Sequence, residues 1–125
     1  MERQVLGKTD ASYSLGISVP AGRLIFISGT VAMDDNGRVV APGDMEKQAR
    51  FVFKRIGKLL EEAGASLHNV VKLTAFVLDM TQYSRFAAVR REVFAPGPWP
   101  ASSTVMVTGL FAEGLMLEVE AVAVV

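Results

Sequence analysis

Several short segments in the first part of the chain alternate apolar and polar positions, as β-strands do when they bury one face. These segments are residues 12–19, 24–28, 31–33 and 39–40. The first two are predicted to pair as a hairpin across the turn 21–23, with Gly29 ending the second strand. Asn36 and Gly37 form a strong turn signal, so the last two segments are predicted to pair across it.

A helix is the clearest element that the pattern predicts, and it starts after Asp44. Asp44 follows Pro42 and Gly43 and is placed to cap the helix N-terminus, while Gly64 is placed to end the helix. Apolar residues recur every three or four positions and share one face, while charged residues cover most of the other. The apolar positions are Met45, Ala49, Val52, Phe53, Ile56, Leu59, Leu60 and Ala63.

The second half of the chain predicts a long strand, a second helix and two final strands. The strand covers residues 69–80, and the helix runs from residue 82 to about residue 94 with Thr81 as its N-cap. Its apolar stripe is Phe86, Val89, Val93 and Phe94, whereas Arg85, Arg90 and Arg91 are predicted to lie on a solvated face. The last two strands are predicted at residues 103–110 and 115–125.

This order of elements predicts an α+β fold in one domain, residues 1–125, with two helices packed on one face of a mixed β-sheet. The strands carry apolar residues on both faces, and the helices can cover only one of them. Phe26, Phe76 and the closing segment "VEAVAVV" are therefore expected to be buried by association with further copies of the chain. A ring such as a homotrimer is one closed arrangement that does this.

Composition excludes several classes of site. The chain has 13 basic and 13 acidic residues, no cysteine and one histidine, His68. The absence of cysteine excludes disulfides, thiolate catalysis and cysteine-based zinc sites. The single histidine and the carboxylates show no spacing that is typical of metal ligands. The balanced net charge gives no overall electrostatic attraction to nucleic acid. No apolar run approaches the ~18 residues that a membrane-spanning helix needs. We therefore expect a soluble cytoplasmic protein without a membrane or nucleic-acid partner.

Three segments carry a resemblance to a known family: "ISGTVAMD", "LLEEAGASLHNVVKLTAFVLDM" and "LEVEAVAVV". With them, the chain resembles the RidA/YjgF family from about Tyr13 to Val125. The resemblance implies a chorismate-mutase-like fold and a homotrimer with ligand clefts between subunits. Members of the archetypal branch hydrolyse enamines and imines such as 2-aminoacrylate to 2-keto acids and ammonia. Older names for the family are translation initiation inhibitor and endoribonuclease L-PSP.

The chain departs from the family pattern at the residue that binds the substrate carboxylate. The archetypal branch has Pro-Ala-Arg-Ser where this chain has Pro100, Ala101, Ser102 and Ser103. A serine has neither the charge nor the planar fork of a guanidinium. The chain therefore resembles a divergent member that lacks this arginine. Leu15, Thr30 and Ala87 also stand where the family often has polar residues, and one alternative is that Arg85, Arg90 or Arg91 replaces the missing arginine.

The resemblance implies a small-ligand cleft that is lined by specific residues of this chain. Glu118 and Ser102 are the catalytic candidates, and the ligand-binding candidates are Tyr13, Ser28, Gly29, Phe86, Trp99 and Ser103. No metal or organic cofactor is implied. Each position also has a structural explanation: Glu118 could be a solvated carboxylate beside Glu120, and the serines could satisfy backbone groups in a turn.

Three functions remain open at this point. The first is hydrolysis of enamines or imines without a strong demand for a substrate carboxylate. The second is a trimer that binds or senses a small ligand without catalysis. The third is ribonuclease activity, which needs an acid, a base and cationic phosphate contacts. His68 is expected at the surface, so we rank RNA cleavage below a small-molecule role.

Overall fold

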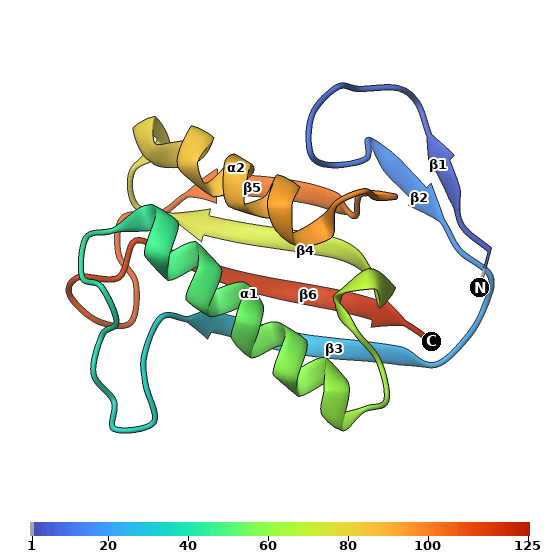
Figure 1. The fold of residues 1–125 in the computed structure, drawn as a ribbon. Coiled ribbons are helices and arrows are strands. Elements are labelled where there is room, and N and C mark those ends of the chain that lie inside the picture. The colour runs from blue at the N-terminus through green and yellow to red at the C-terminus, as the bar shows by residue number, and fades with distance from the viewer. Residues whose placement is uncertain (1) are drawn as a thin grey trace.

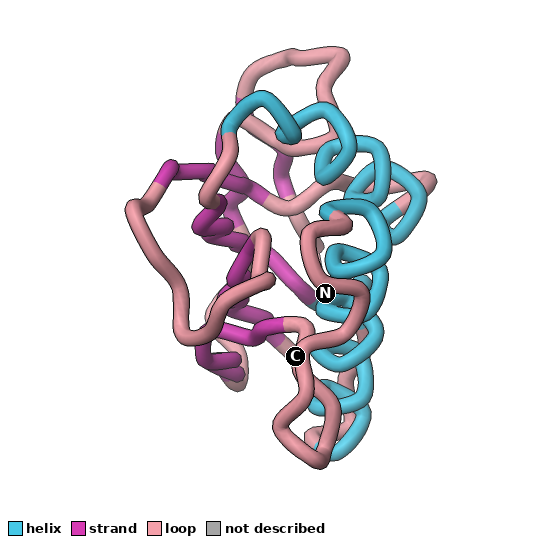
Figure 2. Tube along the Cα trace, turned by 90° about the vertical axis from the view of Figure 1, so that its left-hand side faces the viewer, coloured by secondary structure: helices cyan, strands magenta, loops and turns pink. Residues whose placement is uncertain are grey.

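Two helices, α1 (Met45–Glu62) and α2 (Tyr83–Phe94), lie on the same face of a four-stranded sheet in the computed structural model, which describes residues 2–125 (Figure 1). The sheet order is β3 (Leu24–Val31), β6 (Leu117–Val124), β4 (Val70–Val77) and β5 (Ala101–Met106). Strands β4 and β5 are parallel, and the other two pairs are antiparallel. Figure 2 shows the helices on one side and the strands on the other. The predicted α+β fold with a mixed sheet is confirmed.

The ends of α1 are those that the sequence predicts. The Asp44 carboxylate accepts a hydrogen bond from the Lys47 backbone N–H at 3.0 Å. Gly64 follows the helix with φ of 74°, a conformation that glycine adopts without strain. The turn at Asn36 and Gly37 also forms, and it brings Met33 opposite Val39 in a single bridge.

The predicted hairpin between residues 12–19 and residues 24–28 does not form. Strand β2 (Gly16–Ser18) pairs with β1 (Gln4–Leu6) in a separate two-stranded sheet, and β3 pairs with β6. The reason is length, because β3 and β6 each have eight residues and form a long ladder, whereas β2 has three. Pro20, which has no N–H to donate, follows β2 after one residue.

The predicted N-cap of the second helix is also wrong. A short 3₁₀ turn, Met80–Gln82, precedes α2, and Asp79 caps that turn. The Asp79 carboxylate accepts hydrogen bonds from the Thr81 backbone N–H at 3.0 Å and from the Thr81 hydroxyl at 2.6 Å. Thr81 is therefore a donor to the cap and not the cap itself. A further 3₁₀ turn, Leu67–Asn69, leads into β4.

The two faces of the sheet differ in what covers them. The helix-facing residues of β4 and β6 are almost fully buried: Leu73, Ala75, Val77, Leu117, Val119, Ala121 and Ala123. Their neighbours on the opposite face are partly or fully exposed: Lys72, Thr74, Phe76, Glu118, Glu120 and Val122. We call this second face, together with Phe26 and Ser28 of β3, the open face. Phe26 is 72% exposed there, and neither helix packs against the open face (Figure 2).

Gln48 of α1 joins three parts of the chain from a fully buried position. Its amide nitrogen donates to the carbonyl oxygens of Val40, Ala41 and Gly114 at 2.8–3.1 Å. Its amide oxygen accepts from the Met116 backbone N–H at 2.7 Å. Gln48 thereby satisfies the backbone of the segments before α1 and before β6. The apolar pattern of the predicted helix gave no signal for this role.

Gln48→Leu is expected to lower the free energy of unfolding by about 2–4 kcal/mol, because it leaves buried carbonyl and N–H groups without partners. Urea denaturation followed by circular dichroism at one fixed protein concentration measures this. Lys54→Met, at an exposed position of the same helix, is the control and should change the free energy by less than about 0.5 kcal/mol. An equal effect of both substitutions would contradict the assigned role of Gln48.

Candidate functional site

Tyr13 and Ser102 come together at the β5 edge of the sheet. They line a cavity of about 370 Å³ with Met80, Tyr83 and Thr104. Ser102 reaches it because its partner in the parallel pairing, Leu73, points toward the helices, so Ser102 lies on the same face as α2. Tyr13 belongs to the segment before β2, whose Ser14 backbone N–H donates to the Pro100 carbonyl. We call Tyr13, Tyr83, Arg90 and Ser102 the β5-edge group.

Arg90 is the largest difference from the predicted site. Its side chain is only 1% exposed, so its placement on a solvated face is wrong, although Arg85 and Arg91 are exposed as predicted. The guanidinium donates from Nε to the Ser12 hydroxyl at 3.0 Å, from Nη1 to the Ser102 hydroxyl at 3.1 Å, and from Nη2 to the Tyr83 hydroxyl at 2.9 Å. An arginine of α2 therefore contacts the serine that replaces the family arginine.

The surroundings of Arg90 explain how a cation can be buried there. Its guanidinium carbon lies 5.1 Å from the centre of the Tyr13 ring, 5.6 Å from that of Tyr83 and 5.3 Å from that of Phe86. Aromatic faces attract cations, and the three hydroxyls replace part of the lost hydration. No carboxylate within residues 2–125 forms an ion pair with Arg90. The positive charge is therefore hydrogen-bonded but not neutralised.

Ser28, Gly29 and Glu118 form a second group at the opposite edge. A β-bulge at Ser28 and Gly29 interrupts the pairing of β3 with β6. The Glu118 side chain lies directly against Gly29, since a Cβ built on Gly29 would lie 1.9 Å from the Glu118 Oε2. Only glycine allows this approach. A cavity of about 410 Å³ beside the bulge is lined by both β3 residues, and we call the three residues the β3-edge group.

The sheet order keeps these two groups apart. Strand β3 forms one edge and β5 forms the other, with β6 and β4 between them. Glu118 also lies on the open face, whereas Ser102 lies on the helix-covered face. A single copy of the chain therefore does not bring together the predicted catalytic residues Glu118 and Ser102.

Ser103 lies on the other side of β5 from Ser102, because successive side chains of a strand alternate. The Lys72 ammonium lies 3.4 Å from the Ser103 hydroxyl and 3.2 Å from that of Thr74, and donates to the Leu73 carbonyl at 2.7 Å. Partial burial lowers the pKa of Lys72, and nearby Glu120 opposes this shift. Ser103 thus belongs to a polar cluster on the open face.

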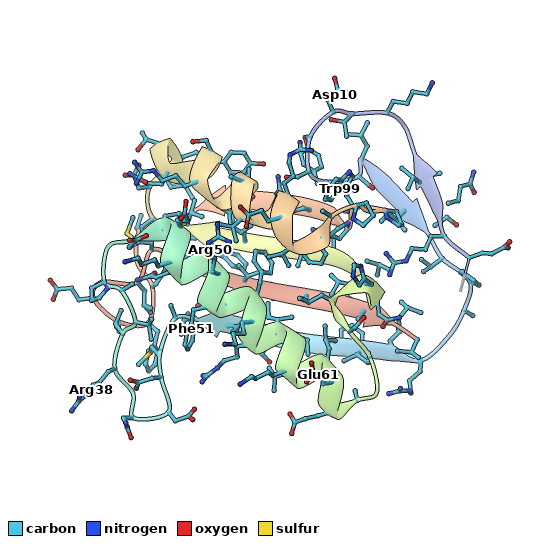
Figure 3. All side chains as sticks on the ribbon, viewed as in Figure 1. Asp10, Arg38, Arg50, Phe51, Glu61 and Trp99 are labelled. Atoms are coloured by element: carbon cyan, nitrogen blue, oxygen red, sulfur yellow. The ribbon has the colours of Figure 1, made fainter. Side chains whose placement is uncertain are left out.

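Phe86 and Trp99, the other two aromatic ligand candidates besides Tyr13, differ in position. Phe86 is a fully buried core residue that stacks on Phe53 at 5.9 Å between ring centres, and it lines none of the cavities described here. Trp99 is half-buried and lines a cavity of about 370 Å³ with residues of the loop that joins β1 to β2. The Arg91 guanidinium lies 5.5 Å from the centre of the Trp99 ring and donates to the Asp10 carbonyl. Figure 3 shows Asp10 on the loop that joins β1 to β2, with Trp99 below this loop.

Ser12, Tyr83 and the buried position of Arg90 are the parts of this arrangement that were not predicted. Ser12 and Tyr83 gave no motif, because a serine before a short strand and a tyrosine at a helix start are common. The one available signal was the position of Arg90. It follows Val89 and precedes Phe94 by four residues, which places it at the border of the apolar stripe.

None of the helices within residues 2–125 is long and apolar enough to cross a membrane. His68 is exposed on its 3₁₀ turn, as predicted.

Comparison with known proteins gives consistent matches over nearly the whole chain. Residues 6–125 match the family model described as Endoribonuclease L-PSP. A RutC family protein of Pyrococcus abyssi is 35% identical over 89% of this chain and 84% of its own length. The 2-iminobutanoate/2-iminopropanoate deaminase of Mus musculus is 32% identical over 98% of this chain and 91% of its own.

A solved structure agrees with these sequence matches. The Yersinia pestis protein YyfB, described as a protein of unknown function of the conserved Rid family, superposes with a TM-score of 0.90 and 26% identity, covering 100% of both chains. Together with the family match, the sheet order and the two helices on one face, this similarity establishes that the chain belongs to the RidA/YjgF family.

Proposed function

We propose that the chain assembles as a homotrimer and binds small metabolites in clefts between its copies. The observation that carries this proposal is the separation of the two groups at opposite edges of one sheet. A contact that joins the β5-edge group of one copy to the β3-edge group of the next would complete the site. Such a contact is head-to-tail, and it closes into a ring when the rotation allows.

The open face supports the same assembly. It presents Phe26 and the half-exposed Phe76 and Val122 to solvent in the isolated chain. Apolar side chains in a contiguous sheet face are usually covered by another protein surface. The same surface therefore gives a physical reason for association and brings Glu118, which lies on it, to a boundary between copies.

Hydrolysis of enamines or imines is the reaction that we propose for this cleft. Water adds to the carbon of the C=N bond, the C–N bond then breaks, and the products are a carbonyl compound and ammonia. Glu118 is suited to hold and deprotonate the water, and the backbone at Ser28 and Gly29 can orient the reacting nitrogen. The name of the mouse relative, a 2-iminobutanoate/2-iminopropanoate deaminase, supports this reaction class.

Two other functions are ranked lower. A trimer that binds a ligand without turning it over would have the same cleft, and an activity assay separates the two. RNA cleavage is suggested only by names, those of the family model and of some solved relatives. Exposed His68 lines none of the cavities that hold the candidate residues, so no histidine is placed to act in RNA cleavage there. We also propose a cytoplasmic location, as the sequence analysis predicts.

Phe26→Asp is expected to convert the trimer into a folded monomer, because it places a charge on an apolar contact surface. Sedimentation velocity measures the change, and far-ultraviolet circular dichroism checks that the fold is kept. Ala88→Asp is the control: Ala88 is exposed on α2, which packs on the opposite side of the sheet from the open face, so the same charge placed there should leave the trimer intact. A monomeric wild-type protein, or a Phe26→Asp variant that stays trimeric, would contradict the proposed assembly.

Gly29→Ala and Glu118→Gln are expected to lower kcat for freshly generated 2-aminoacrylate or 2-iminobutanoate by roughly 100-fold. The first displaces the Glu118 carboxylate by the steric overlap described above, and the second removes its charge. A coupled assay of keto-acid and ammonia formation provides the measurement.

Gly109→Ala and Glu113→Gln are the controls for these two substitutions. Gly109 has open space around its Cα, and Glu113 is exposed in the same loop, so both variants should keep wild-type rates. Wild-type turnover in Glu118→Gln would remove Glu118 from the mechanism. An inactive wild-type trimer would favour the non-catalytic ligand-binding function.

A further inference from the structure

Two hydroxyls share both the β5-edge cavity and one guanidinium. Ser102 and Tyr83 line the cavity, and each accepts a hydrogen bond from a different terminal nitrogen of Arg90. Since both nitrogens belong to one planar group, the two hydroxyl oxygens are held next to each other at its end. Their positions are therefore set by a buried and well-packed side chain.

The direction of these hydrogen bonds leaves two protons available. A hydroxyl that accepts from an N–H still has its own O–H to donate. Ser12, the third partner of Arg90, donates its O–H to the Ala87 carbonyl at 3.1 Å. Within the part of the chain that the structure describes, neither the Ser102 hydroxyl nor the Tyr83 hydroxyl donates to a protein acceptor. Both hydroxyls therefore present donors at the wall of the cavity.

The charge of Arg90 makes these donors selective for an anion. The acidic groups of α2 and of the turn before it are already paired: Glu92 binds Arg50 at 2.6 Å, and Asp79 accepts from Thr81. The hydrogen bond from Arg50 also holds the pKa of Glu92 below its ordinary value. An unneutralised cation in a buried site raises the local potential and polarises the hydroxyls bonded to it.

We propose that the Ser102 and Tyr83 hydroxyls bind the carboxylate of the ligand, and that Arg90 is the positioning residue that orients and polarises them. This inference rests on the proposed function and deepens it, because it assigns recognition of the substrate carboxylate to three residues of this chain that the family pattern does not supply. The carboxylate accepts from both hydroxyls, and the apolar part of the ligand packs against Met80 and Tyr13. The site thereby recognises an anion although Ser102 stands where the family has arginine, contrary to the expectation of a weak demand for a carboxylate.

A purely structural role for Arg90 makes a different prediction. Arg90 also ties the segment around Ser12 to α2 and β5, so its loss would loosen this region for every ligand. A structural role changes the binding of charged and uncharged ligands by the same factor. A role in anion recognition changes only the binding of the charged ligand.

The test compares carboxylates with their methyl esters. Butanoate, 2-oxobutanoate and benzoate, each beside its methyl ester, are titrated into the trimer and followed by NMR chemical shifts. Wild-type protein is expected to bind at least one acid roughly tenfold or more tightly than its ester. Tyr83→Phe and Ser102→Ala each remove one donor and are expected to weaken acid binding roughly 10- to 100-fold while leaving ester binding unchanged.

Arg90 is tested through a pair of substitutions. Arg90→Met removes the charge and the donors, so the preference for acid over ester is expected to disappear. Arg90→Lys keeps the charge and is expected to retain part of that preference. Arg85→Gln, which removes an exposed charge from the same helix, should bind as wild type does. Melting temperatures of all variants report any general loss of stability.

Two outcomes would overturn this inference. One is wild-type protein that binds no acid more tightly than its ester. The other is an unchanged acid preference in Tyr83→Phe and Ser102→Ala. Neither outcome concerns oligomeric state or turnover, so a trimer that hydrolyses imines with no acid preference would refute this inference and leave the proposed function standing. An acid-selective trimer without turnover would refute the proposed hydrolysis and leave this inference standing.

Discussion

The covering of only one sheet face by helices is the constraint on which the rest of this structure depends. Both α1 and α2 pack on the same side, so the alternating strands bury one row of side chains and leave the other row open. The open face carries Phe26 beside polar residues such as Glu118. In the proposed trimer, the contact that hides the apolar residues of the open face is also the contact that completes the cleft, so stability and chemistry depend on one surface.

In the site that we propose, Arg90 keeps a positive charge near the ligand, but the charge lies at a different position from that of the family arginine. A guanidinium on a cavity wall binds a carboxylate directly, through a planar fork. Here the guanidinium lies behind Ser102 and Tyr83, surrounded by aromatic rings, and reaches the cavity through their hydroxyls. Hydroxyl donors form fewer and less rigid contacts than the fork, and their selectivity depends on the buried cation behind them.

The sequence predicted the parts of the fold that depend on local patterns. Asp44 and Gly64 bound α1 as predicted, and the helices and long strands lie close to their predicted ranges. The failures are non-local. Strand β2 pairs with β1 and not with β3, because partner choice depends on the length of the available ladder. Arg90 was assigned to solvent because an arginine at the border of an apolar stripe normally extends outward, and only the tertiary packing of Ser12, Tyr83 and Ser102 supplies its partners.

A subunit-mixing experiment tests the central claim that the site needs two copies. Glu118→Gln disables the β3-edge group, and the double variant Ser102→Ala/Tyr83→Phe disables the β5-edge group when the substrate concentration is kept below KM. The two variants are unfolded together in equal amounts, refolded, and assayed for imine hydrolysis. If clefts join neighbouring copies, random mixing restores about a quarter of wild-type activity, since that share of clefts receives both intact groups. Activity that stays at the average of the two separate variants would contradict the account, because it would place each complete site within one chain.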